Sequence, residues 1–257
     1  MRFVLVHGGF HGAWCWERVV PELQALGHEA IAIDLPGHGA RVDEEVTLKT
    51  RQQALVDVIE AGDVLVGHSG GGYDITLAAD AVPERIGHLI YLGTGLLIEG
   101  KPLIEASGGR PAEDVAQDGR TQLMTDDTGM MEFIATDSRG NMVCADFEKT
   151  WAFFYHDCDE QTARRAFERL TPAPVGFIQE PVHLSRFWHA DLPRSYIRCL
   201  QDRAAPAWLS AQAAERLGVE PLTIDASHSP FLSRPRETAE LFEQAVATLP
   251  TGPLQPR

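Results

Sequence analysis

One serine stands in a run of residues whose types could form a covalent catalytic site. Positions 67–71 read Gly-His-Ser-Gly-Gly, with Ser69 at the centre. A short apolar run, 63–66, precedes this motif and a helical pattern begins near Gly72. Gly-x-Ser-x-Gly between a strand and a helix is typical of a tight turn that exposes a nucleophilic hydroxyl, and flanking side chains would collide with the strand and the helix. The sequence therefore predicts Ser69 as a nucleophile, in preference to a glycine-rich structural turn.

A serine nucleophile needs a base to take its proton, and the base needs an acid to orient it. In strand-turn-helix sites of this kind the chain order is serine, acid, histidine. His228 follows the last predicted strand, 220–224, and precedes the final predicted helix, which is where a base should project. The remaining histidines fit less well, because they precede Ser69, open a buried strand or lie in a predicted insertion. We therefore expect His228 to be the base.

The acid should follow the predicted strand at 195–200, and Asp202 stands there. Asp225 is an alternative, but it lies three residues before His228, at the end of a strand, and we expect it to point elsewhere. Asp202 is therefore the predicted acid of the triad, and a carboxylate that only caps a loop is the competing interpretation for either residue.

Acyl transfer also needs N–H donors aimed at the oxyanion that develops on the substrate. One donor should be the backbone N–H of Gly70, directly after the nucleophile. The other should come from the loop His-Gly-Gly-Phe at 7–10, where glycine lets the backbone approach a substrate. We expect Gly9 to provide it, with Phe10 as the less favoured neighbour. A tight strand-to-helix turn without a catalytic role is the alternative.

Strands and helices must alternate along the chain to position these residues. Short, nearly continuous apolar runs indicate strands buried on both faces, and they lie at 3–6, 30–33, 63–66, 88–92, 195–200 and 220–224. Helical patterns separate them at 16–26, 48–61, 206–217 and 235–249. This alternation predicts an α/β fold with a mostly parallel, doubly wound sheet. We expect 1–94 and 193–250 to form the core, 95–192 a helical cap insertion and 251–257 a flexible tail.

The composition excludes several classes of function. The 257 residues carry a formal net charge of -15, which argues against nucleic acid, since binding phosphates needs clustered cations. No run of apolar residues reaches the length of a membrane-spanning helix. The four cysteines are scattered without a CxxC pair, so reduced thiols and a cytoplasmic location are expected.

Aromatic residues of the predicted cap are candidates for lining an apolar substrate pocket. With two residues of the first loop, the candidates are Phe10, His11, Trp151, Phe154, Phe187 and Trp188. The run His-Asp-Cys-Asp at 156–159 is not expected to bind a metal, because adjacent side chains rarely converge on one ion. Asp159 instead resembles an N-cap for the helix predicted at 160–170. No dinucleotide or Walker-type glycine loop is present in the sequence, and we expect no cofactor.

Several segments together resemble one known family. The segments 7–16 (HGGFHGAWCW), 34–39 (DLPGHG) and 67–71 (GHSGG), with Asp202 and His228, are similar to the hydroxynitrile lyase and plant methylesterase branch of the α/β-hydrolases, which includes bacterial carboxylesterases. The resemblance covers most of the chain, and the cap least well. It implies an α/β-hydrolase fold, a triad of Ser69, Asp202 and His228, and oxyanion donors at Gly9 and Gly70.

The same resemblance separates lyase from esterase. Hydroxynitrile lyases of this branch typically have Thr, Cys and Lys where this chain has Gly8, Gly70 and Ser229. An esterase acting on a small carboxylic ester, thioester or lactone through an acyl-enzyme is therefore favoured. Cleavage of an amide or a C–C bond, lyase chemistry, and ligand binding without turnover stay open as alternatives. A homodimer is suggested only by analogy with the fold.

Overall fold

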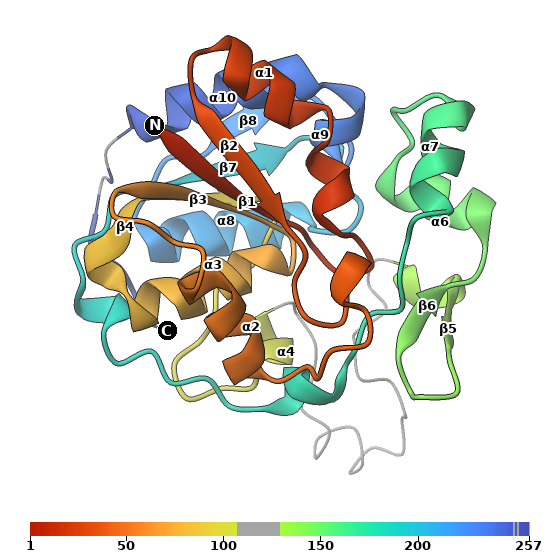
Figure 1. Ribbon diagram of the computed structural model, residues 1–257, viewed down its shortest axis with the longest axis horizontal. Helices are drawn as coiled ribbons and strands as arrows, with labels where there is room; N and C mark the ends of the chain where they lie inside the picture. Colours follow the sequence, from red (N-terminus) through yellow and green to blue (C-terminus); the bar gives the residue numbers. More distant parts are fainter. Residues whose placement is uncertain (107–128, 249, 251, 257) are drawn as a thin grey trace.

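Six parallel strands form the centre of the protein (Figure 1). The computed structural model describes residues 1–248 except 107–128, together with 250 and 252–256. The sheet order is β2-β1-β3-β4-β7-β8, and all neighbouring pairs are parallel. The strands are β1 (Arg2–Val6), β2 (Glu29–Ile33), β3 (Asp63–His68), β4 (Ile86–Leu92), β7 (Arg194–Cys199) and β8 (Leu222–Ile224). The chain passes from β1 to one edge and returns to place β3 on the other side of β1. The place between β1 and β3, where the chain reverses its direction across the sheet, is the switch point. Ligands of such sheets bind there, outside the carboxyl ends of the strands.

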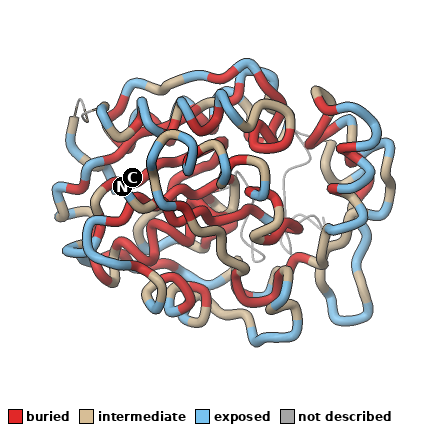
Figure 2. Tube along the Cα trace, turned by 45° about the horizontal axis from the view of Figure 1, so that its top comes forward, coloured by how far each residue is buried: buried red, intermediate tan, exposed pale blue. Residues whose placement is uncertain are grey.

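Helices cover both faces of the sheet, as the doubly wound prediction requires (Figure 1). One face carries α1 (Val19–Ala25) and α10 (Pro235–Val246), and the other carries α2 (Leu48–Val56), α3 (Gly71–Ala81) and α8 (Ala207–Leu217). Alternate residues of β1 pack against the helices of the two faces. Phe3 and Leu5 lie on the α1 side, and Val4 and Val6 lie on the opposite side. Figure 2 shows buried segments in the interior of the molecule and exposed segments along its outside, and β1, β3 and β4 are almost entirely buried. The predicted α/β fold with a mostly parallel sheet is confirmed.

The insertion between β4 and β7 lies beside the carboxyl ends of the strands (Figure 1). It contains α4 (Leu103–Ala106), α6 (Phe147–Phe154) and α7 (Glu160–Phe167). It also contains an antiparallel hairpin, β5 (Ile134–Thr136) with β6 (Met142–Cys144), which the helical pattern did not predict.

Short 3-10 helices occur along the described chain, in the core and in the insertion: η1 (Ala13–Trp16), η2 (Gly39–Arg41), η3 (Pro83–Arg85), η4 (Met130–Glu132), η5 (Gly176–Gln179) and η6 (Phe187–His189).

Two local elements differ from those expected. The helix expected at 16–26 is divided into η1 and α1, since Pro21 is tolerated only in the first turn of a helix. The closing helix begins after a separate short turn, α9 (Pro230–Ser233). The described part of the predicted flexible tail makes backbone hydrogen bonds, including Gly252 N to Gly218 O at 2.9 Å and Gln255 N to Arg216 O at 2.8 Å. Within the described residues, no helix has the length and apolar character needed to cross a membrane.

Candidate active site

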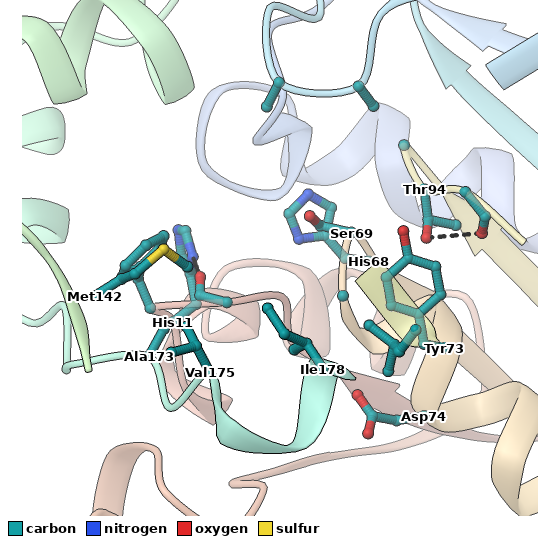
Figure 3. A pocket seen from close by; sticks show the side chains of 18 of the residues that line it. His11, His68, Ser69, Tyr73, Asp74, Thr94, Met142, Ala173, Val175 and Ile178 are labelled. Atoms are coloured by element: carbon teal, nitrogen blue, oxygen red, sulfur yellow. Dashed lines mark hydrogen bonds between the residues drawn. The ribbon is translucent and has the colours of Figure 1, made fainter. Parts of the chain in front are cut away.

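A pocket of about 190 Å³ lies at the switch point, beyond the carboxyl ends of β1 and β3. The loop after β1 contributes Gly9, Phe10 and His11, and the turn after β3 contributes Ser69 and Gly70. His228 reaches the same pocket from the loop between β8 and α9. Figure 3 shows Ser69 and His68 in the middle of the lining side chains, with residues of the insertion such as Met142 and Ala173 to one side. The fold therefore brings the predicted nucleophile, base and oxyanion donors to one cavity.

The turn that carries Ser69 is sterically tight. Ser69 has a φ of +50°, a left-handed conformation that costs energy for a residue with a Cβ. A Cβ on Gly67 would lie 2.5 Å from the Gly71 carbonyl oxygen, and a Cβ on Gly71 would lie 2.6 Å from that of His7. Both flanking glycines are thus required by close backbone approach. The Ser69 N–H donates to Leu92 O at 3.0 Å, which anchors the turn to β4.

Asp202 and His228 form a buried pair beside this turn. His228 Nδ1 lies 2.8 Å from Asp202 Oδ2, and both side chains are only 3% exposed. A carboxylate can only accept here, so Nδ1 carries the proton and Nε2 is left as the basic nitrogen. The other carboxylate oxygen, Oδ1, accepts from the N–H groups of Ala204 and Ala205, each at 2.8 Å. The alternative acid, Asp225, is exposed and accepts instead from Gln201 Nε2 at 2.7 Å.

The histidine directly before Ser69 supports the loop of His228. His68 Nε2 donates to the His228 carbonyl oxygen at 2.8 Å, and the two rings lie with their centroids 4.5 Å apart. Burial, followed by the charge of His228, lowers the pKa of His68 well below its usual range. His68 therefore stays neutral and ties the turn after β3 to the loop after β8. The sequence places it in the motif, but its partner is visible only in the fold.

The loop after β1 is held in shape by its own histidine. His11 Nδ1 donates to the Gly9 carbonyl oxygen at 2.8 Å, and the Tyr155 hydroxyl donates to His11 Nε2 at 2.6 Å. Burial, opposed in part by the bond to Gly9, lowers the pKa of His11 to about 4, so the ring is neutral. A Cβ placed on Gly70 would lie 3.6 Å from Gly9 N. The backbones that carry the two predicted oxyanion donors therefore face the same space.

Comparison with known proteins agrees with this architecture. Residues 3–241 match the alpha/beta hydrolase family. The chain belongs to this family. It is 29% identical to norfluorocurarine synthase 2 of a Strychnos species, covering 93% of this chain and 92% of the relative. It is also 29% identical to methylesterase 9 of Arabidopsis thaliana, covering 93% and 95% of the two chains. A pyrethroid hydrolase from Sphingobium faniae JZ-2 has the same fold, with a TM-score of 0.79, 24% identity, and coverage of 96% and 98%. The expected α/β-hydrolase membership and methylesterase-like branch are thus confirmed.

Three of the six aromatic pocket candidates line the pocket of this α/β-hydrolase: Phe10, His11 and Phe154. The other three lie elsewhere. Trp151 is half-buried and donates to Cys158 O at 3.2 Å, which turns its indole along the insertion. Phe187 is fully buried in the layer below the sheet, and Trp188 donates to Glu99 Oε2 at 2.8 Å. Apolar residues outside the predicted set also line the pocket, among them Met130, Met142, Val175, Phe177 and Leu209.

Gly8 and Ser229 stand where hydroxynitrile lyases of the resembled branch have Thr and Lys, and the structure shows how much room each position offers. A Cβ on Gly8 would lie 2.8 Å from Ser69 Cβ, so a threonine there would require the loop or the nucleophile to shift. Ser229 is fully buried, and among the described residues it is not part of the pocket lining. A lysine there would have to leave this buried site to reach the substrate.

Two aspartates of the run His-Asp-Cys-Asp at 156–159 make hydrogen bonds that stabilise the fold. Asp159 caps α7 by accepting from the N–H of Thr162 at 2.8 Å, as its N-cap interpretation predicted. Asp157 accepts from the N–H of Ser227 at 3.0 Å and from the Ser233 hydroxyl at 2.7 Å, joining the insertion to the loop of His228. Within the described ranges, no group of three or more metal-type ligands converges.

Proposed function

We propose that this protein is a carboxylesterase-type serine hydrolase that cleaves a small carboxylic ester through an acyl-enzyme. The observation that carries the proposal is the 2.8 Å contact of His228 Nδ1 with the buried Asp202, in a pocket that Ser69 also lines. This contact leaves the basic Nε2 of His228 available for the serine proton. The name of the methylesterase relative supports the same reaction class.

The reaction would proceed in two halves. In the first, His228 Nε2 takes the Ser69 proton as the hydroxyl oxygen attacks the ester carbonyl, and the N–H groups of Gly9 and Gly70 stabilise the oxyanion. The tetrahedral intermediate then collapses, and His228 protonates the leaving alcohol. In the second half, His228 activates a water that attacks the acyl-enzyme and releases the acid. Asp202 holds the tautomer and stabilises the imidazolium in both halves.

The pocket favours a small and mostly apolar substrate. Its volume of about 190 Å³ is below that of a drug-sized site. Methionine and aliphatic side chains of the insertion provide much of its lining. We propose that these apolar residues bind the hydrocarbon parts of the ester by burial. A cytoplasmic location and a homodimer remain predictions from the sequence.

Labelling and turnover together test the proposal. The wild-type protein should hydrolyse p-nitrophenyl acetate and be labelled at Ser69 by a serine-directed fluorophosphonate. Ser69→Ala and His228→Ala should each lose on the order of 10⁴-fold in kcat or more. Ser138→Ala is the matched control, because Ser138 is exposed and outside the pocket. Hydrolysis that survives Ser69→Ala would refute the mechanism, and a protein that neither reacts nor is labelled would be a binding member of the fold.

A further inference from the structure

The pocket has a buried polar end that the proposed ester hydrolysis does not use. Arg51 of α2 and Asp74 of α3 both line the pocket, and their residues are only 5% and 2% exposed. Arg51 Nε and Nη2 donate to the two carboxylate oxygens of Asp74 at 2.8 and 2.7 Å. Figure 3 shows Asp74 at the margin of the lining side chains, apart from Ser69. The two opposite charges form one bidentate, mutually neutralised pair.

One donor of this pair has no partner. Arg51 Nη1 is buried and makes no hydrogen bond to the described residues, while the guanidinium lies 4.9 Å from the centre of the Phe177 ring. A buried N–H without a partner is costly, and buried polar groups in proteins are nearly always satisfied. Because Arg51 lines the pocket, a bound molecule can supply the missing acceptor.

A histidine of the same pocket offers the complementary group. His38 Nδ1 lies 3.3 Å from the Pro36 carbonyl oxygen, so Nδ1 carries the proton and Nε2 carries the lone pair. His38 Nε2 is buried and also makes no hydrogen bond to the described part of the chain. Burial, followed by the charge of Arg51, lowers the pKa of His38 to about 3, so this lone pair is free at neutral pH. Two residues of the pocket lining, Arg51 and His38, therefore hold one unused donor and one unused acceptor.

We propose that Arg51 and His38 form a subsite for a neutral hydroxyl group of the substrate. A hydroxyl accepts from Arg51 Nη1 through its oxygen and donates its proton to His38 Nε2. This inference rests on the proposed ester hydrolysis and deepens it: the substrate is a hydroxylated ester, whose apolar part contacts the insertion. The hydroxyl orients the ester, and it takes no part in bond breaking.

The charges of the subsite argue against an ionic group. A carboxylate would accept from Arg51, but it would face the lone pair of His38, and Asp74 already balances the arginine. An ammonium would add a second positive charge to a site that already holds the guanidinium of Arg51. The net charge of -15 further disfavours an anionic substrate. A hydroxyl satisfies both unpaired atoms without adding charge to the buried site.

The test compares matched esters on Ser69→Ala, a variant that binds without turnover. Calorimetry would measure Kd for methyl esters of ω-hydroxyalkanoates, for the same esters without the hydroxyl, and for monomethyl dicarboxylates, over a series of chain lengths. Acetate esters of diols would place the hydroxyl on the alcohol side. At one chain length, the hydroxyl ester should bind at least about tenfold more tightly than its deoxy analogue, because that analogue leaves buried polar groups unpaired. The dicarboxylate should show no gain.

Variants then assign the preference to the subsite. On the Ser69→Ala background, His38→Phe and the double variant Arg51→Met with Asp74→Leu should each reduce the hydroxyl preference toward onefold. The double variant removes both charges of the pair, and circular dichroism checks that it is folded. If it does not fold, His38→Phe decides alone. Phe154→Leu is the matched control, because this apolar lining residue should affect both esters alike.

The outcomes separate the subsite from the reaction. The subsite is overturned if no chain length prefers the hydroxyl, if the dicarboxylate binds best, or if the preference survives in the variants. An absence of preference would mean that no substrate hydroxyl binds Arg51 Nη1 and His38 Nε2. Hydrolysis of p-nitrophenyl acetate by the wild type tests the proposed reaction separately, because acetate has no hydroxyl to place. A protein inactive on that ester could still show the binding preference.

Discussion

Replacement of Asp202 by asparagine should reverse the tautomer of His228. Asp202 Oδ1 accepts two backbone N–H groups, from Ala204 and Ala205, at 2.8 Å. An asparagine keeps both of these bonds only if its carbonyl oxygen takes the place of Oδ1. Its NH2 group then faces His228 Nδ1, which must accept instead of donate. The proton moves to Nε2, and His228 can no longer receive the proton of Ser69.

The structure sets the size of this effect. To restore the active tautomer, the asparagine would have to turn its NH2 toward two N–H donors, giving up both hydrogen bonds. Each lost bond costs about 0.5–1.5 kcal/mol, and each buried donor left unpaired costs about 1–3 kcal/mol. Even then the carboxylate charge that stabilises the imidazolium is missing. These losses together are of the order of 10⁴-fold in kcat.

The assay is steady-state hydrolysis of p-nitrophenyl acetate by wild type, Asp202→Asn and Asp225→Asn, each at several pH values. Asp225 is the matched control, because it is the nearby carboxylate that the sequence offered as the alternative acid, and it is exposed. Asp225→Asn should keep kcat within about twofold, whereas KM for Asp202→Asn should change much less than kcat. Urea unfolding of all three proteins shows whether a loss of activity reflects a loss of folding.

Two results would refute this reasoning. If Asp202→Asn retains activity within about tenfold of wild type, the carboxylate does not set the tautomer of the base. If Asp225→Asn loses activity as strongly as Asp202→Asn, the acid has been assigned to the wrong residue. A folded Asp202→Asn protein that is inactive beside an active Asp225→Asn protein is the expected pattern.

Three further perturbations test the surroundings of the proposed triad. Tyr155→Phe removes the donor to His11 Nε2 and leaves it unpaired, so unfolding measurements should show a loss of about 1–3 kcal/mol. Its kcat should fall about tenfold with KM nearly unchanged, because the oxyanion loop loses support. Gly71→Ala places a Cβ 2.6 Å from a backbone oxygen, and kcat/KM should fall about 100-fold, while Gly176→Ala, with open space around it, should match wild type in the same assay. The low pKa values of His11 and His38, about 4 and about 3, mean that the unfolded chain binds more protons below about pH 6.5. Urea titrations should therefore show stability falling as pH drops from 6.5 toward 4, by roughly 3 kcal/mol from His11 alone, and a flat profile would contradict the neutral state of these rings.

The parts of the fold that follow local periodicity could be predicted from the sequence. The strand at 63–66 is apolar on both faces from Val64 to Val66, and the glycine motif follows directly, so the position of Ser69 at a strand end could be predicted. The hairpin of β5 and β6 was not readable, because its short strands are only partly buried and carry little alternation. The division of the first helix depends on Pro21, a signal that was present in the chain.

The sequence predicted the residues of the candidate site only where their positions follow from the order of strands along the chain. Asp202 and His228 follow predicted strands, and the fold brings them within 2.8 Å of each other. The pocket lining depends on the tertiary arrangement of the insertion, so aromatic character was a poor guide: Phe187 enters the core while Met142 reaches the pocket. The position of Arg51 in the pocket is harder still to predict from the sequence, because charged residues are seldom fully buried and its partner Asp74 is distant in sequence.

The histidines around Ser69 differ from the proposed base, His228, in the partner of the ring. His7, His11, His38 and His68 all lie in buried positions near the pocket, and each ring has a nitrogen directed at a backbone carbonyl. Burial lowers the pKa of all four, so they stay neutral at neutral pH. Of the histidines that lie in or beside the pocket in the described part of the chain, His228 is the one whose ring nitrogen faces a carboxylate, that of Asp202. In the proposed mechanism, a proton taken from Ser69 would therefore be stabilised on His228, and the neutral rings would add no charge to oppose it. Chain order excluded these four histidines in the sequence, but the physical reason is the carbonyl partner of each ring and the absence of a carboxylate beside it among the described residues.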